Sequence, residues 1–265
     1  MAIDRVLPGL ALSTLVAGSL MAVLWLVQRR TRNAAIVDVG WSASLPLLAL
    51  LHAATSPGSS TRSWLLASMA CVWGGRLALH LYRQRLAGHP EEGRYARLRE
   101  EWGPAANRKF FWFFQFQAVA AAVLALPFLL VSLDSRPGLG LLEWLGTLLW
   151  LVGVAGEATA DAQLEAFKSD PDRQGRVCQR GLWRYSRHPN YFFEILVWVG
   201  YATFASASPG FPWPWLSPAI MASTILFFTG IPPTEAQALR TRGDEYRRYQ
   251  RTTSRLVPWF RKWEA

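Results

Sequence analysis

The sequence has little charge, few cysteines and few histidines. Asp, Glu, Lys and Arg make up 17% of its 265 residues, below the roughly 25% of a typical soluble domain. Its two cysteines, Cys71 and Cys178, and its four histidines show no spacing typical of a disulfide framework or a metal site. The Gly-rich nucleotide motifs of soluble folds, GxGxxG and GxxxxGK[ST], are also missing. We therefore expect no metal site and no soluble nucleotide-binding domain.

Apolar residues are abundant instead. They form 51% of the chain and include 14 Trp and 14 Phe, a composition that excludes a disordered protein. A membrane-spanning helix needs about 20 mostly apolar residues. Stretches that approach this length lie at 8–28, 34–54, 63–82, 110–133, 139–160, 191–208 and 215–232. We predict an all-α fold, in which residues 1–265 form a single membrane domain, a bundle of seven transmembrane helices.

The positions of the basic residues predict how this bundle is oriented. The formal net charge of +10 would suggest a nucleic-acid partner in a soluble protein. Here nearly all of the 28 Lys and Arg follow the first, third, fifth and seventh stretches. Because cytoplasmic loops retain basic residues, we expect the N-terminus outside and the C-terminus in the cytoplasm. The basic excess then reflects topology and contact with membrane lipids, and we expect no nucleic-acid partner.

The last residues are expected to form a cytoplasmic basic tail, 235–265, packed at the membrane interface. Its Trp259, Phe260 and Trp263 are residues typical of an interfacial anchor. We expect an integral, multi-pass protein of a bacterial inner membrane, with no evident obligate protein partner.

Several ionisable residues fall inside the apolar stretches, where each costs at least about 2.5 kcal/mol unless it has a partner or a function. Asp38, Arg76 and His80 lie in the second and third stretches, and Glu194 lies in the sixth. Glu143 is the one such residue expected near the outer end, so the pattern predicts a polar cavity that opens to the cytoplasm. A purely structural ion pair between Asp38 and Arg76 would explain part of the same pattern.

The fifth stretch carries three acids, Glu157, Asp161 and Glu165, at helical spacing. Like charges on one helix face repel unless cations offset them. Lys168, Arg176 and Arg187 of the following loop could do so, while Glu165 could equally face the headgroups. The inner loops hold Arg, amide and aromatic side chains that suit a dinucleotide, because guanidinium groups grip phosphates and aromatic rings cover bases.

One motif is far more specific than this composition. Residues 181–194 read GLWRYSRHPNYFFE, and WVGY follows at 198–201. This motif, with Asp161 and Arg176 upstream and the 245–249 (EYRRY) and 257–259 (VPW) segments downstream, resembles the C-terminal signature of the membrane steroid 5α-reductase family, including its bacterial branch. The resemblance implies NADPH-dependent reduction of a carbon–carbon double bond conjugated to a ketone. The implied substrate is a 3-oxo-Δ4 steroid or another flat lipophilic enone that enters from the bilayer.

The resemblance also implies roles for individual residues. It implies that NADPH is bound by Arg76, Gln84, Glu157, Asp161, Lys168, Arg176, Arg187, His188, Asn190, Tyr191 and Glu194. Asp38 lies within a residue of the carboxylate that, with a tyrosine, activates the carbonyl in the animal enzymes. This chain departs from the pattern because Trp73 occupies the position of that tyrosine. We therefore expect Asp38 to be the sole catalytic acid, with its pKa raised by apolar surroundings.

Two other functions fit parts of the sequence. Isoprenylcysteine and phospholipid methyltransferases carry a similar Arg-His-Pro-x-Tyr element, so residues 187–191 and Glu235 could form a site for S-adenosylmethionine. Against this, those enzymes usually have Gly where Phe192 or Phe193 stands, and paired acids where this chain has Thr234 and Glu235. A lipid-binding or transport protein would use the buried charges as a pathway, but no inverted repeat is visible. The reductase is the preferred interpretation.

Overall fold

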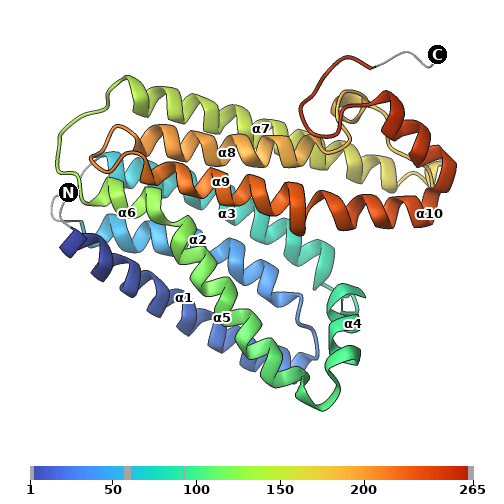
Figure 1. Cartoon of the computed structure of the whole chain (residues 1–265), viewed down its shortest axis with the longest axis horizontal. Helices are drawn as coiled ribbons and strands as arrows, with labels where there is room; N and C mark the ends of the chain where they lie inside the picture. The colour runs from blue at the N-terminus through green and yellow to red at the C-terminus, as the bar shows by residue number, and fades with distance from the viewer. Residues whose placement is uncertain (1–2, 57–60, 92, 262–265) are drawn as a thin grey trace. The chain divides into compact units, whose positions relative to one another are not determined.

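The computed structural model describes residues 3–56, 61–91 and 93–261 (Figure 1). Over these residues the regular structure is helical, apart from one isolated bridge between Ser186 and Ser254. The long helices are α1 (Ile3–Thr31), α2 (Ile36–Ala54), α3 (Thr61–Arg85), α5 (Ala106–Leu124), α7 (Leu141–Lys168), α8 (Pro189–Ala205) and α10 (Ile231–Thr252). Shorter ones are α4 (Gly93–Trp102), α6 (Leu126–Ser132), α9 (Leu216–Ser223), the π-helix η5 (Thr224–Phe228) and the 3-10 turns η1 (Gly103–Ala105), η2 (Pro171–Arg173), η3 (Gly181–Arg184) and η4 (Trp213–Trp215). The predicted all-α fold is confirmed.

Five helical segments of the described chain are long and apolar enough to cross a membrane. They are Asp4–Thr31, Ile36–Ala54, Thr61–Arg85, Leu141–Lys168 and Trp213–Thr252. A bent pair, Gly93–Leu124 with Leu126–Ser132, raises the number to six if it forms one span. At 17 residues, α8 is near the lower limit of about 17–25 for a span. Helices able to cross a membrane are thus confirmed, whereas seven spans with the N-terminus outside stay a prediction.

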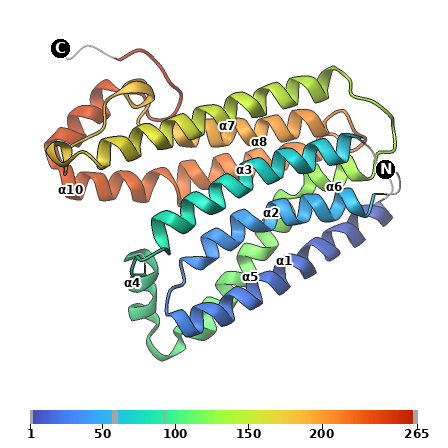
Figure 2. The same cartoon turned by 180° about the vertical axis from the view of Figure 1, so that it is seen from behind.

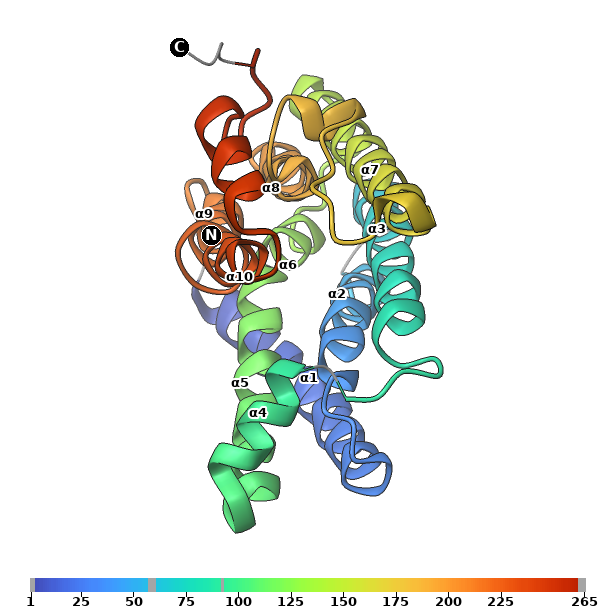
Figure 3. The ribbon, with the colours of Figure 1, turned by 90° about the vertical axis from the view of Figure 1, so that its right-hand side faces the viewer.

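The long helices break where the sequence disfavours an α-helix. The pair around Ala125 bends by 44°, and Pro127 lies in the first turn after the bend. The apolar α9 runs into η5, and Gly230 then separates η5 from α10. Within α10, Gly243 has φ 49° and ψ −121°, so two helical parts meet there at an angle (Figure 3). Glycine allows this left-handed turn because it has no Cβ.

The chain divides into two compact units, and each is described by itself. Unit 1 comprises Met1–Glu143 and Ala205–Ser217, and unit 2 comprises Trp144–Phe204 and Pro218–Ala265. The expectation of one membrane domain with a basic tail from residue 235 stays a prediction, and Trp263 of that tail lies outside the described residues.

In unit 1, α2 packs against both α1 and α3, and α1 packs against α5 (Figure 2). A buried ion-pair cluster ties one end of this unit together. The guanidinium of Arg62, 1% exposed, binds the carboxylates of Asp134 and Glu143, and its Nη2 donates to Ser208 Oγ at 2.9 Å. We expected Glu143 to be the one buried ionisable residue near the outer end of the spans. This expectation is wrong, because Arg62 and Asp134 are buried beside Glu143. Sequence reasoning placed those two in loops and missed that the fold covers them.

In unit 2, glycines let α7 and α8 approach closely (Figure 1). A Cβ placed on Gly146 would lie 2.5 Å from the backbone nitrogen of Phe204, and one on Gly200 would lie 2.8 Å from that of Trp150. Gly153 faces Val197 in the same way. Small residues at a helix interface allow such backbone contact in membrane proteins, where van der Waals packing drives association. This tight pair supports the loop that precedes α8.

Candidate functional site

The loop that carries the 181–188 part of the motif is fixed to α7. Gly181 turns the chain with φ 54°, and the backbone N–H of Leu182 donates to Gln163 Oε1 at 2.8 Å. The indole of Trp183 is buried and donates to the carbonyl of Ala160 at 2.9 Å. Helix α8 then begins at Pro189, a residue suited to a first helical position because it lacks an N–H. The loop is thus held rigidly at the start of α8.

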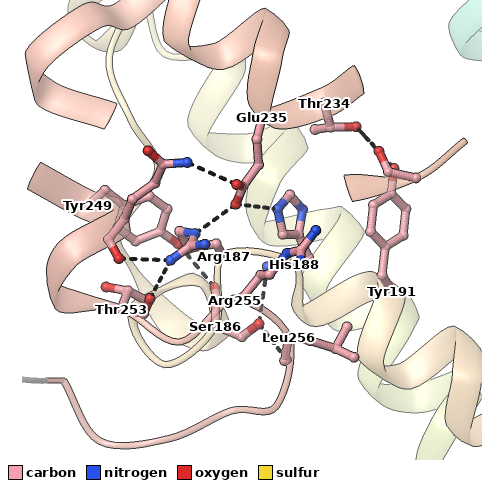
Figure 4. Close-up of polar contacts among 12 residues, drawn as sticks. Ser186, Arg187, His188, Tyr191, Thr234, Glu235, Tyr249, Thr253, Arg255 and Leu256 are labelled. Atoms are coloured by element: carbon pink, nitrogen blue, oxygen red, sulfur yellow. Dashed lines mark hydrogen bonds and ion pairs between the residues drawn. The ribbon is translucent and has the colours of Figure 1, made fainter. Parts of the chain in front are cut away.

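Glu235 of α10 is the acceptor that joins this loop to the C-terminal helix (Figure 4). Its Oε1 accepts from Arg187 Nε at 2.8 Å and lies 3.1 Å from His188 Nε2. Its Oε2 accepts from Gln250 Nε2 at 2.9 Å. The Arg187 Nη1 also donates to the carbonyls of Gln250 and Thr253, at 2.9 and 2.7 Å. Arg187 and Glu235 therefore form a mostly buried, hydrogen-bonded ion pair, not a free surface charge.

The second part of α10 packs over the same loop. The hydroxyl of Tyr249 donates to the carbonyls of Trp183 and Ser186. The backbone N–H of Val177 donates to Glu245 Oε1 at 3.1 Å, and Val177 joins Tyr246 and Tyr249 in a small buried cluster. These contacts hold α10 and the segment after α7 on either side of a common space.

That space is a cavity of about 380 Å³ within unit 2. Five of its lining residues are cationic: Lys168, Arg173, Arg176, Arg187 and Arg242. Aromatic rings also line it, those of Phe167, Trp183, Tyr191, Tyr246 and Tyr249. The lining residues in the described chain include no Asp or Glu. A cavity of this charge and surface suits an anionic ligand that carries flat rings.

Two buried polar atoms of the lining, in the part of the chain that the structure describes, have no hydrogen-bond partner: Asn190 Oδ1 and Arg242 Nε. One is an acceptor and the other a donor. Asn190 Nδ2 is directed to Asp161 Oδ1 at 3.4 Å, which leaves the amide oxygen available. Buried polar atoms in proteins are nearly always paired, so both atoms point to a ligand or water in the cavity.

Burial also shifts the pKa values of two groups in the part of the lining that lies between α7 and α8, His188 and Cys178. It lowers the pKa of His188 below its ordinary value, although the neighbouring Glu235 favours the protonated ring. His188 therefore tends to be neutral and suited to hydrogen bonding. Burial likewise raises the pKa of the Cys178 thiol, which outweighs the opposite influence of nearby Arg180 and Arg173. Cys178 is consequently a poor nucleophile at neutral pH.

The structure brings half of the sequence-predicted site residues together. The cavity is lined by Lys168, Arg176, Arg187, His188, Asn190 and Tyr191. Asp161 lies next to it through Asn190. Glu157 and Glu194 are buried on α7 and α8 but do not line it, and Glu194 Oε1 accepts from Trp198 Nε1 at 2.9 Å. Asp38, Arg76 and Gln84 belong to unit 1 and stay predictions.

The surroundings of Asp38 differ from expectation. Its carboxylate pairs with Arg85, accepts from Tyr95 Oη at 2.7 Å, and lies 3.5 Å from Arg94 Nη2. The expected apolar environment is therefore wrong, because α4 folds back to supply a tyrosine and an arginine. Trp73 is fully buried against Trp41, with ring centroids 6.5 Å apart. A hydroxyl beside Asp38 is thus present, but α4 provides it and α3 does not.

Sequence reasoning missed the α10 side of the cavity. Ala238, Arg242, Tyr246 and Tyr249 follow Glu235 at intervals of three or four residues, the spacing of one helix face. That spacing was a usable signal, but the basic composition of 235–265 led to the prediction of a tail packed at the membrane interface. Arg173 was missed because loop arginines have no periodicity. Over the described residues no group of three or more His, Cys, Asp and Glu could hold a metal.

Fold and site together describe a helical membrane-type protein with a basic, aromatic-lined cavity beside the start of α8. The chain belongs to the family described as "Protein of unknown function (DUF1295)", whose model matches residues 24–253. It is also 28% identical over 211 residues to the uncharacterized protein C594.04c of Schizosaccharomyces pombe. That match covers 69% of this chain and 61% of the yeast protein. The chain therefore spans less than two thirds of the length of this relative.

Proposed function

We propose that this protein is an integral-membrane NADPH-dependent reductase that acts on the carbon–carbon double bond of a lipophilic enone. The observation that carries the proposal is the cavity in unit 2, with its five cationic side chains, its aromatic walls and its two unpartnered polar atoms. The motif at 181–194, which resembles the steroid 5α-reductase signature, forms one wall of this cavity.

The charge of the cavity favours a dinucleotide over the main competing ligand. NADPH carries several negative phosphate charges, which the cationic lining would neutralise through charge-assisted hydrogen bonds. S-adenosylmethionine carries a sulfonium cation, which the same lining would repel. The volume is near the lower end of the roughly 300–1,000 Å³ of ligand pockets, so it suits the phosphate-bearing half of a dinucleotide.

The residues present fit this cofactor in three ways. Lys168, Arg173, Arg176 and Arg242 would hold phosphates. Tyr191 and the other aromatic side chains would cover a ring, and the amide of Asn190 would take a ribose hydroxyl or a carboxamide. Arg187 and His188 direct their polar atoms to Glu235 and so support the wall. When bound, NADPH supplies the hydride that reduces the double bond.

The remaining parts of the proposal come from the resemblance. The substrate would be steroid-like and would enter from the bilayer, and Asp38 would supply the proton or polarise the ketone. The cytoplasm would supply the cofactor, in line with the predicted positive-inside orientation.

The test is a binding measurement on detergent-purified protein. The change is Arg242→Gln, which removes a cationic side chain that lines the cavity. The matched control is Arg240→Gln, which removes an exposed cationic side chain of the same helix that does not line the cavity. A hydrogen bond to a charged group contributes about 1.5–3 kcal/mol, so Arg242→Gln should weaken NADPH binding about tenfold or more. Arg240→Gln should leave the affinity unchanged. Saturable retention of S-adenosylmethionine with none of NADPH would overturn the proposal in favour of a methyltransferase.

A further inference from the structure

The residues after α10 lie along the loop that carries the motif. This tail segment, residues 253–260, has irregular structure and is hydrogen-bonded to the loop at three points. Arg187 N donates to the carbonyl of Ser254 at 2.9 Å. Ser186 Oγ donates to the carbonyl of Leu256 at 2.7 Å (Figure 4). Further along, Trp259 N donates to the carbonyl of Tyr185 at 2.9 Å. The tail segment therefore lies against the loop that forms one wall of the cavity and does not itself line the cavity.

The outward side chains of the tail segment are large and apolar. Val257, Trp259 and Phe260 are 52%, 67% and 79% exposed. Tyr185 of the adjoining loop is also exposed. Exposed aromatic groups that adjoin one another on a backbone held by hydrogen bonds mark an interaction surface.

A contact within unit 2 places this surface at the end of an apolar span. The guanidinium of Arg255 donates to the carbonyl of Leu226 at 3.1 Å. Leu226 belongs to η5, whose Phe227 and Phe228 are exposed, as expected for lipid-facing residues. Directly after η5 the polar α10 begins. The tail segment thus meets the chain where its composition changes from apolar to charged, the level of the headgroups in a membrane protein.

The charges beside the apolar side chains are positive. Arg251 and Arg255 are exposed, and Arg261 follows the tail segment. Aromatic side chains with basic neighbours are the combination that binds the surface of an anionic bilayer, because rings enter the interface while cations contact phosphates.

We propose that the tail segment docks on the headgroup layer of anionic lipids, and that this docking clamps the loop wall of the cavity. Trp259 and Phe260 enter the interface, while Arg251 and Arg255 contact lipid phosphates. The hydrogen bonds to residues 185–187 transmit the attachment to the loop. The proposal does not depend on which ligand the cavity binds.

The first experiment measures docking in the full chain, reconstituted in nanodiscs of zwitterionic lipid with or without anionic phosphatidylglycerol. An environment-sensitive fluorophore is attached at Phe260→Cys, in a Cys71→Ser/Cys178→Ser background. The matched position is Asp244→Cys, a highly exposed site at the turn within α10. With anionic lipid, the label at 260 should shift to the blue and be quenched by lipids brominated near the headgroup, and the label at 244 should not.

Charge variants identify the source of this docking. Arg251→Gln/Arg255→Gln should weaken the anionic-lipid dependence about fivefold for each arginine, and salt should do the same. The control pair Arg240→Gln/Arg247→Gln removes the same charge elsewhere on α10 and should retain the dependence. Docking is overturned if the label at 260 stays in water in both lipids. It is also overturned if the two double variants show the same dependence on anionic lipid.

The second experiment measures the clamp through Cys178, which lines the cavity and is buried. In a Cys71→Ser background and anionic nanodiscs, Trp259→Ser/Phe260→Ser should raise the alkylation rate of Cys178 at least about fivefold, because a released loop exposes the thiol. The control variant, Phe211→Ser/Trp213→Ser, also removes two exposed aromatic side chains and should leave the alkylation rate of Cys178 unchanged. Equal Cys178 rates in both variants would overturn the clamp even where docking is observed.

Discussion

At the scale of single residues, the organisation of the candidate site depends on Glu235. Arg187 and His188 belong to the 181–194 motif, and both direct polar atoms to this carboxylate. A cation as buried as Arg187 is costly without its counter-ion, because desolvation is then uncompensated. These two residues of the motif therefore hold the loop against α10 as well as lining the cavity.

We predict that Glu235→Ala strongly destabilises the protein. Breaking a buried ion pair costs about 3–5 kcal/mol, and Gln250 also loses its acceptor. Thermal unfolding in detergent should show a clear drop in Tm, smaller for Glu235→Gln, which keeps an acceptor oxygen. The control is Glu165→Ala, which removes an exposed acid of α7 and should have little effect. A stable Glu235→Ala protein that merely loses ligand affinity would instead make Glu235 a binding residue.

At the scale of elements, the pairing of α7 with α8 holds the cavity's wall in position. The two backbones touch at Gly146, Gly153 and Gly200, so the pair has little room for any added atom. These glycines were not singled out from the sequence, because a glycine inside an apolar stretch does not reveal which helix it faces. Only the packed helices show that these three positions leave no room for a side chain.

We predict that Gly200→Ala destabilises the pair by about 1–3 kcal/mol, the usual cost of overpacking. The new methyl group would lie within 2.9 Å of backbone atoms of Trp150 and Gly146, which cannot move as a side chain can. The matched change is Gly75→Ala on α3, where no atom lies within 4 Å. That variant should be neutral or slightly more stable, since alanine favours helix. Equal Tm values for the two variants would contradict close packing at Gly200.

At the scale of the whole molecule, the proposed function divides its roles between the two units. The cavity residues belong to unit 2, whereas Asp38, with Arg85, Arg94 and Tyr95 around it, belongs to unit 1. If Asp38 acts as the acid, a substitution at Asp38 should change turnover without changing NADPH affinity, and a substitution in the cavity should change NADPH affinity.

Asp38→Asn should therefore leave NADPH affinity intact while slowing turnover about a hundredfold, a typical effect of removing a general acid. Turnover is followed as NADPH oxidation in a screen of 3-oxo-Δ4 steroids, Δ14-sterols and long-chain enones. Tyr95→Phe removes only the hydroxyl that donates to Asp38 and should have a smaller effect. Weakened NADPH binding with normal turnover at saturation would remove Asp38 from the catalytic role.

Composition and local pattern were enough to predict the class of this protein. Long apolar stretches can satisfy their backbone groups in lipid only as helices, so the all-α, membrane-type fold follows from the order of residues alone. The loop after α7 and the start of α8 were likewise recognisable as part of the candidate site, because that motif is contiguous in the chain.

The rest of the site arose from contacts between distant segments. Glu235 and Tyr249 reach the motif from the two helical parts of α10 that meet at Gly243. Tyr95 reaches Asp38 because α4 folds back. Neither juxtaposition has a local signature. Burial of Arg62 beside Asp134 and Glu143 has the same origin. Periodicity along one helix specifies which residues share a face, but packing free energy summed over the folded chain selects what that face meets.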